Sequence, residues 1–156
     1  MTVRAPRAVC VWWFPVSYLA HAMEEYCCGD TFPVWISRVA RVDFTSTAFL
    51  WLNGIALVCM LAAAWLASHE PRLRPLAATL ATICAINGGA HAIASIATAS
   101  YSPGLVTGVC VWLPLGGTVL LQCSRELPRR ALVAGVLLGV LAHALVSAIV
   151  LTSGKP

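Results

Sequence analysis

Six polar side chains that lie in otherwise apolar segments could bind a metal ion or transfer protons. They are His21, Glu24, Glu25, Asn87, His91 and His143. In one mechanism, imidazole and carboxylate ligands bind one divalent metal ion, zinc or iron, and a second carboxylate acts as a base on a metal-bound water. The ligands available to such an ion are the three histidines and the two glutamates, His21, Glu24, Glu25, His91 and His143.

The same residues also support a mechanism that needs no metal ion. Adjacent carboxyl groups in a low-dielectric site do not both ionise easily, so Glu24 and Glu25 would offer one acid and one base. A histidine would shuttle the proton, while Asn87 polarises a carbonyl or stabilises a developing charge. The residue types leave both mechanisms open.

The spacing of these residues places them on shared helix faces. At about 100° per residue, Glu24 and Glu25 lie on either side of His21 within one arc. Asn87 and His91 are four residues apart and also share a face. Counted at ~1.5 Å per residue from the start of each segment, Asn87 and the three histidines lie about 16 to 22 Å deep. The spacing therefore predicts one polar layer inside a helical bundle.

Composition identifies the class of protein that must position these residues. The chain has 156 residues, of which 60% are hydrophobic and 10% are charged, whereas a soluble domain carries about 25% charged residues. Mean hydropathy is +0.84. These values exclude a soluble domain and leave no room for a nucleotide-binding or nucleic-acid-binding module. The net charge of +4 is explained by arginines that flank apolar segments, so we expect no nucleic-acid partner.

Apolar segments long enough to cross a hydrocarbon core of ~30 Å divide the chain into a bundle of about five transmembrane helices. The predicted spans are 8–26, 47–68, 76–98, 104–123 and 131–152, and residues 1–156 form a single all-α membrane domain. With five crossings, seven of the basic residues lie on one side and three on the other. This asymmetry predicts a cytoplasmic N-terminus. We expect the membrane to be the cytoplasmic membrane of a bacterial cell.

Two segments allow a second interpretation. Arg4 and Arg7, an apolar stretch and the triplet Ala20-His21-Ala22 also have the pattern of a cleavable signal peptide, although the bulky residues 12–15 are unusual there. Residues 31–43 form either a short amphipathic helix in the membrane interface or a loop.

Small residues suggest which faces pack against other helices. Gly135, Gly139, His143 and Ser147 recur every four residues, as on contact faces between membrane helices. We therefore expect His143 to face a helix. A histidine or asparagine in such a place commonly forms an interhelical hydrogen bond, and Glu24 and Glu25 could instead mark the aqueous end of the first segment.

These motifs resemble a known family. The pattern His21-x-x-Glu24-Glu25, the spaced pair Asn87 and His91, and His143 in the last segment are similar to the HXXEE family of small integral membrane proteins. Residues 101–107, Tyr-Ser-Pro-Gly-Leu-Val-Thr, also resemble the Y-x-P-G stretch of that family. The resemblance covers nearly the whole chain and implies a membrane-embedded enzyme without specifying its reaction.

A polar site at membrane depth predicts a lipophilic small-molecule substrate that enters from the lipid bilayer. We expect a hydrolase, or an isomerase or cyclase, acting on a lipid or on an isoprenoid or sterol-like molecule. The alternative is a small transporter, proton relay or structural membrane subunit that uses the same polar cluster. A relay needs polar residues throughout the membrane thickness, and the cytoplasmic halves of the segments are almost wholly apolar. The sequence makes no prediction of oligomeric state.

Overall fold

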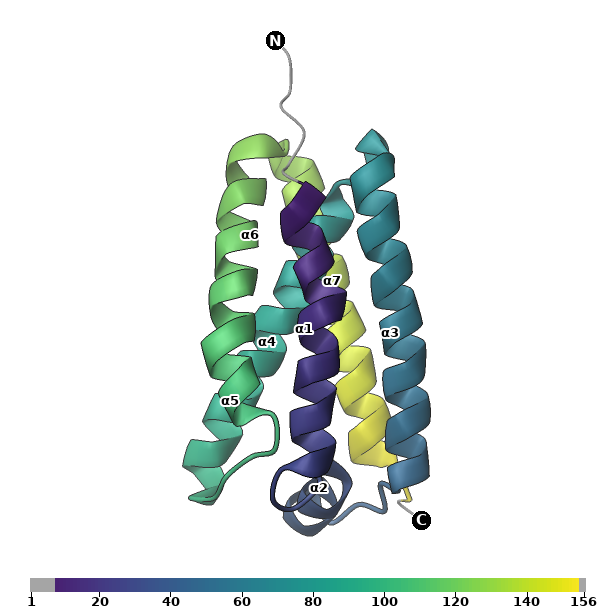
Figure 1. Cartoon of the computed structure of the whole chain (residues 1–156), viewed down its shortest axis with the longest axis vertical. Helices are drawn as coiled ribbons and strands as arrows, with labels where there is room; N and C mark the ends of the chain where they lie inside the picture. The colour runs from purple at the N-terminus through teal and green to yellow at the C-terminus, as the bar shows by residue number, and fades with distance from the viewer. Residues whose placement is uncertain (1–7, 155–156) are drawn as a thin grey trace.

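The structure, a computed structural model, describes residues 8–154, and every regular element in this range is helical. The elements are α1 (Ala8–Cys27), α2 (Phe32–Ala40), α3 (Ser46–His69), η1 (Pro71–Leu73), α4 (Pro75–Thr98), α5 (Leu105–Thr107), η2 (Gly108–Trp112), α6 (Leu113–Glu126) and α7 (Arg129–Thr152). The long helices run side by side along the longest axis of the molecule (Figure 1). The predicted all-α class is confirmed.

Within the described residues, four helical stretches are long and apolar enough to cross a membrane. They are Ser46–His69, Pro71–Thr98, Leu105–Glu126 and Arg129–Thr152. Large apolar side chains on these stretches point away from the bundle: Ile96 is 82% exposed and Trp51 is 71% exposed. A surface of this kind is suited to lipid, and the chain is therefore a membrane protein.

Helix α1 is not one of these four stretches, although it has 20 residues and runs alongside them in the bundle (Figure 1). The reason is its composition, since His21, Glu24 and Glu25 lower the mean hydropathy of its C-terminal half. Length and hydropathy thus identify four of the five predicted spans. The first half of α1 is apolar, and its second half carries the predicted polar motif.

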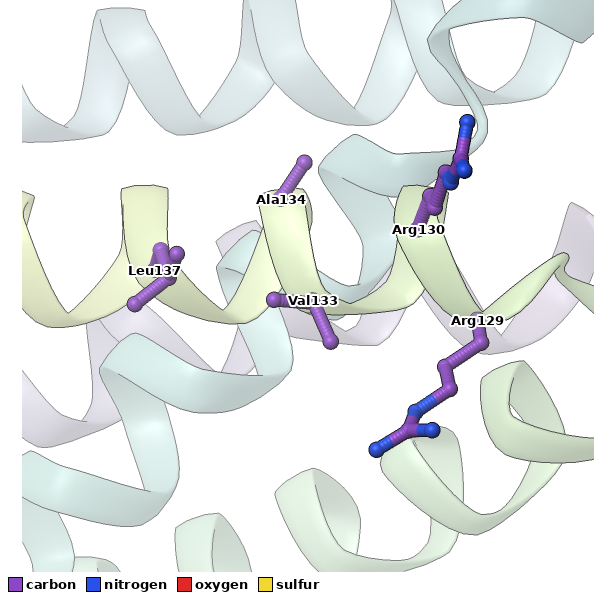
Figure 2. A pocket seen from close by; sticks show the side chains of 5 residues that line it. All are labelled: Arg129, Arg130, Val133, Ala134 and Leu137. Carbon is purple, nitrogen blue, oxygen red and sulfur yellow. The ribbon is translucent and has the colours of Figure 1, made fainter.

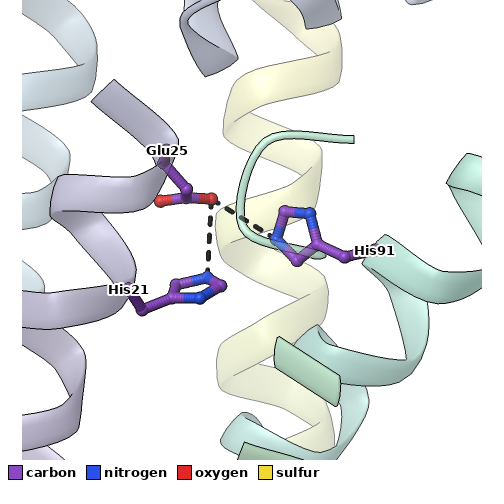
Figure 3. Close-up of side chains that lie close together, drawn as sticks. All are labelled: His21, Glu25 and His91. Carbon is purple, nitrogen blue, oxygen red and sulfur yellow. Dashed lines mark ion pairs between the residues drawn. The ribbon is translucent and has the colours of Figure 1, made fainter. Parts of the chain in front are cut away.

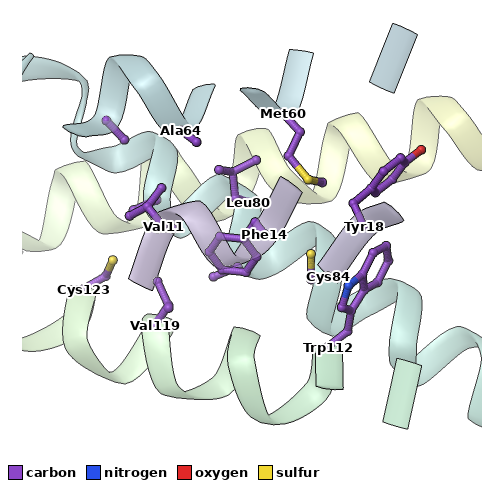
Figure 4. Packing of buried hydrophobic residues seen from close by; sticks show 14 residues of the cluster. Val11, Phe14, Tyr18, Met60, Ala64, Leu80, Cys84, Trp112, Val119 and Cys123 are labelled. Carbon is purple, nitrogen blue, oxygen red and sulfur yellow. The ribbon is translucent and has the colours of Figure 1, made fainter. Parts of the chain in front are cut away.

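The apolar half of α1 is part of the main core (Figure 4). Val11, Phe14 and Tyr18, spaced along one face of α1, pack against side chains of α3, α4 and α6. Phe14 is fully buried. Other helices enclose this half of α1. Their packing therefore fixes the position of the polar motif, which follows one to three turns later in the same helix.

Small residues bring α7 and α4 into close contact, as their spacing predicts. A Cβ atom added at Gly135 would lie 2.5 Å from the Pro75 carbonyl oxygen, and one added at Gly139 would lie 2.8 Å from the Thr79 carbonyl oxygen. The Thr79 hydroxyl also donates a hydrogen bond of 3.0 Å to the Gly135 carbonyl. Only glycine allows two helices to approach this closely.

For residues 31–43 the structure shows the helix rather than the loop, and one predicted span differs in detail. Residues 31–43 contain helix α2, whose Trp35 and Ile36 are buried in a second apolar cluster with Phe44 and Phe49. The predicted span 104–123 is not one regular α-helix, because it opens with the short α5 and the π-helical turn η2. Turns of this type are rare and frequently occur at functional sites.

Candidate functional site

Helices α1 and α4 bring two imidazoles and one carboxylate together (Figure 3). His21 and Glu25 are one helical turn apart on α1, and His91 faces them from α4. Glu25 Oε1 lies 3.6 Å from His21 Nε2 and 3.4 Å from His91 Nε2. His21 is 1% exposed, Glu25 is 7% exposed and His91 is 5% exposed. The group is therefore almost completely shielded from the surroundings.

Hydroxyl groups hold the far nitrogen of each imidazole. His21 Nδ1 lies 2.7 Å from Thr107 Oγ1, and His91 Nδ1 lies 2.9 Å from Ser102 Oγ. Ser102 is fully buried, and its backbone N–H donates to the Ser95 hydroxyl at 2.9 Å. With both Nδ1 atoms held in this way, both Nε2 atoms point toward the same carboxylate oxygen.

The π-helical turn η2 supplies a wall of the site. Its Trp112 ring stacks on the His21 imidazole with centroids 3.9 Å apart and planes inclined by 27°. Trp112 Nε1 donates a hydrogen bond of 3.1 Å to the Ser17 hydroxyl of α1. This bond satisfies the only polar atom of a fully buried indole ring, so the ring and the imidazole have fixed orientations.

Glu24 points away from this group and toward residues 101–107. Its carboxylate accepts hydrogen bonds from the Val106 N–H at 2.8 Å, the Thr107 N–H at 2.7 Å and the Thr107 hydroxyl at 2.5 Å. It also accepts one from the Tyr101 hydroxyl. Four donors and no acceptor describe an ionised carboxylate. Glu24 therefore fastens the segment before α6 to the end of α1.

Tyr101 lies in the connection between α4 and α5, and the Glu24 carboxylate affects its pKa. Partial burial, followed by the hydrogen bond that it donates to Glu24, raises the pKa of the Tyr101 phenol above its ordinary value. The phenol consequently remains a hydrogen-bond donor at neutral pH.

Gly104, which belongs to residues 101–107, covers one side of the site. Its φ of +93° lies in the left-handed region that favours glycine. A Cβ atom there would lie 2.7 Å from His21 Cε1, 3.0 Å from His91 Cε1 and 3.1 Å from Glu25 Cγ. The backbone of this segment therefore rests directly on the three side chains, with no room for a larger residue.

The remaining predicted residues are not part of the group of three, although Asn87 adjoins it. Asn87 lies beside His21, and its buried Oδ1 finds no hydrogen-bond partner among residues 8–154. His143, half-buried on α7, is outside the cluster of ligand atoms formed by His21, Glu25 and His91. The structure thus brings together three of the six predicted site residues, His21, Glu25 and His91. Glu24 is hydrogen-bonded to residues 101–107, Asn87 lies beside His21, and His143 lies outside the group.

Residue patterns did not reveal the hydroxyl and glycine residues of the site. Ser102, Gly104 and Thr107 are common residue types in a segment between helices, and their partners are distant in the sequence. The available signal was the Y-x-P-G stretch noted at residues 101–104, which carried no chemical role by itself.

A surface groove lies elsewhere, along the first turns of α7 (Figure 2). It is lined by Arg129, Arg130, Val133, Ala134 and Leu137. This end of the bundle is opposite the end where α1 terminates (Figure 1). The groove shares no lining residue with the buried group.

Comparison with known proteins gives one match. Searches of curated proteins and of solved structures found none. A family model, described as that of a protein of unknown function with an HXXEE motif, matches residues 12–119 and includes His21, Glu24, Glu25 and His91. Because the match extends over more than half of the chain, the protein belongs to the HXXEE family.

Proposed function

We propose that the protein is a membrane-embedded enzyme that acts on a lipophilic substrate through His21, Glu25 and His91. The observation that carries the proposal is the Glu25 carboxylate, which is 7% exposed and lies between two imidazoles inside a bundle of apolar helices. Buried ionisable groups are unfavourable unless they are paired or useful, and they concentrate at functional sites.

The proposed topology has five membrane spans, with α1 as the first and the N-terminus in the cytoplasm. Helix α1 runs the length of the bundle next to the four apolar stretches, which supports its inclusion (Figure 1). Arg72 and Arg74 would then lie on the cytoplasmic side and Arg38 and Arg41 on the outer side, in agreement with the positive-inside rule. The site would lie in the outer half of a bacterial cytoplasmic membrane.

The chemistry we propose assigns different roles to the two glutamates. Glu25 is the acid or base, or a ligand to a metal ion, together with the imidazoles of His21 and His91. Glu24 is a positioning residue, because the hydrogen bonds of its carboxylate within the described residues all come from residues 101–107. Asn87, with a free buried oxygen, is available to a substrate or to a water in the site.

The substrate class follows from the surroundings of the site. A buried centre among lipid-facing helices is reached more readily by a molecule dissolved in the bilayer than by one in water. We propose hydrolysis of a lipid, or isomerisation or cyclisation of an isoprenoid or sterol-like molecule. Because the group is covered by Gly104 and its neighbours, entry of the substrate requires residues 99–107 to move.

Proton transport is the less favoured use of the same residues. A relay needs polar groups at successive depths. The half of the bundle that contains the start of α1 is instead filled by the apolar core, with Val11, Phe14 and Leu80 buried there (Figure 4). A centre with access from one side fits this distribution better.

The test compares membrane lipids of four strains of the source organism. One strain lacks the gene, and the others carry the wild type, Glu25→Gln or His69→Ala. His69 is the exposed last residue of α3. We expect a lipophilic compound to accumulate in the deletion and Glu25→Gln strains alone. Identical lipid profiles in all four strains, with Glu25-dependent proton flux in proteoliposomes, would establish the relay instead.

A further inference from the structure

We infer that His21 Nε2, His91 Nε2 and the Glu25 carboxylate bind one divalent transition-metal ion, with one coordination position left for water. The inference concerns a binding property, so it stands or falls independently of the proposed enzyme activity. It rests on four features of the site: the distances between the ligand atoms, the protons available to His21, the charges around Glu25, and the groups that hold the two imidazoles.

The distances are those of ligands around a common ion rather than of hydrogen bonds. Glu25 Oε1 lies 3.4 Å and 3.6 Å from the two Nε2 atoms, whereas N–H···O bonds have a usual length of about 2.9 Å. Ligands about 2.1 Å from a tetrahedral ion are separated from one another by about 3.4 Å. All three ligand atoms lie within 4.8 Å of one another. The two measured separations are thus close to those expected between ligands of one ion.

The protons on His21 lead to the same conclusion. The single proton of the Thr107 hydroxyl is donated to the Glu24 carboxylate. Thr107 Oγ1 must then accept from His21 Nδ1–H at 2.7 Å, so the neutral imidazole has a bare lone pair on Nε2. That lone pair is buried, points toward a carboxylate oxygen and finds no hydrogen-bond partner among residues 8–154. A cation between the two atoms removes this repulsion.

The charge on Glu25 also calls for a cation. Its ion pairs within the described part of the chain are with His21 and His91, and neither Lys nor Arg takes part. The neighbouring Glu24 adds a second negative charge, since it is ionised by its four donors. A dication would neutralise the pair, which otherwise has an unfavourable charge inside an apolar bundle.

The outer contacts match those of known metal centres. A histidine ligand generally donates its second ring N–H to a fixed acceptor, which sets the direction of the ligating nitrogen. Thr107 and Ser102 hold the two Nδ1 atoms here. Asn87 Oδ1 is buried beside His21 without a hydrogen-bond partner among residues 8–154, and it would be available to a metal-bound water. Two nitrogens and a carboxylate suit zinc and iron more than magnesium or calcium.

The experiment measures binding of Zn²⁺ to the full chain, purified in detergent and stripped with a chelator. We expect one equivalent to bind to the wild type and to His69→Ala, a control that removes an exposed histidine. We expect His91→Ala and Glu25→Ala to lose it. Thr107→Val removes the hydroxyl contacts to His21 Nδ1 and to Glu24 but none of the three ligands, and it should retain the stoichiometry with about 10- to 100-fold weaker affinity.

Substitution of the ion by Co²⁺ tests the ligands without relying on variants that could misfold. We expect a visible spectrum of four- or five-coordinate Co²⁺ with nitrogen and oxygen ligands, and X-ray absorption showing two imidazoles. Thiolate-to-metal charge transfer would assign the ion to the exposed Cys27 and Cys28 and overturn the inference. So would absence of stoichiometric binding to the wild type. If lipid turnover still depends on Glu25 in that case, the proposed function survives without a metal ion.

Discussion

Two adjacent glutamates of one helix have opposite effects on the free energy of unfolding. Glu24 is surrounded by four donors, so its charge stabilises the contact between α1 and residues 101–107. Glu25 has a nearly buried charge with two imidazoles as partners. Without a bound cation, its ionised form is destabilising. Of these two neighbouring residues, Glu24 therefore stabilises the fold, whereas Glu25 is available for chemistry.

Glu24→Gln and Glu25→Gln should consequently behave differently in the metal-free protein. In Glu24→Gln the new amide would direct its N–H₂ group at backbone N–H donors, and we expect a loss of about 2 to 3 kcal/mol in the free energy of unfolding. Glu25→Gln removes a buried charge, and we expect little change. Thermal unfolding in detergent, followed by circular dichroism, measures both, with the exposed Glu126→Gln as the control. Greater destabilisation by Glu25→Gln would contradict this division of roles.

At the scale of elements, the site depends on the connection from α4 to α6. Residues 99–107 supply a hydroxyl partner for each imidazole, the donors to Glu24 and the glycine that covers the centre. Ala99 ends α4 with a φ of 47°, and Gly104 turns the chain into α5 with a φ of +93°. The turn brings this connection back over the ends of α1 and α4, where it acts as the lid of the site.

A comparison of Gly104, which is in the lid, with Gly29, which follows α1, distinguishes the effect of backbone strain from that of steric contact with the site. Gly29 and Gly104 both have positive φ, but a Cβ atom at Gly29 would meet nothing within 4 Å, whereas at Gly104 it would meet both imidazoles. We expect Gly29→Ala to cost about 1 kcal/mol and to leave Zn²⁺ affinity unchanged. Gly104→Ala should also weaken Zn²⁺ binding about tenfold or more, because a displaced ligand is a weaker one. Equal affinities of the two variants, by calorimetric titration, would show that the lid does not press on the centre.

The sequence predicts helices more reliably than it predicts how they face one another. The expected segment 47–68 corresponds to α3 at Ser46–His69, because length and continuous hydropathy define a membrane helix. Spacing also placed His21 and Glu25 on one face. Depth along a helix, however, carries no information on rotation about its axis. His143, for example, is not among the residues whose ligand atoms cluster within 4.8 Å, and the partners of Glu24 are more than 70 residues away in the sequence.

At the scale of the whole molecule, α1 joins the apolar core to the polar centre. Its first half packs through Val11 and Phe14, and its second half carries His21 and Glu25. Four helical stretches could cross a membrane without it, but the centre would lose a histidine, a carboxylate and the anchor of the lid. The arrangement therefore favours retention of α1 in the mature protein over its removal as a signal peptide.

Retention of α1 and an odd number of spans predict a protein whose termini lie on opposite sides of the membrane. Cleavage after Ala22 would remove His21 and produce a chain that begins at Met23. We expect the intact mass of the purified protein to include α1. An N-terminal fluorescent fusion should be bright in the cytoplasm, and a C-terminal alkaline phosphatase fusion should be active outside it. A chain that starts at Met23, or termini on one side, would remove α1 from the membrane and with it the proposed centre, because no residue outside α1 replaces His21 and Glu25 in the described group.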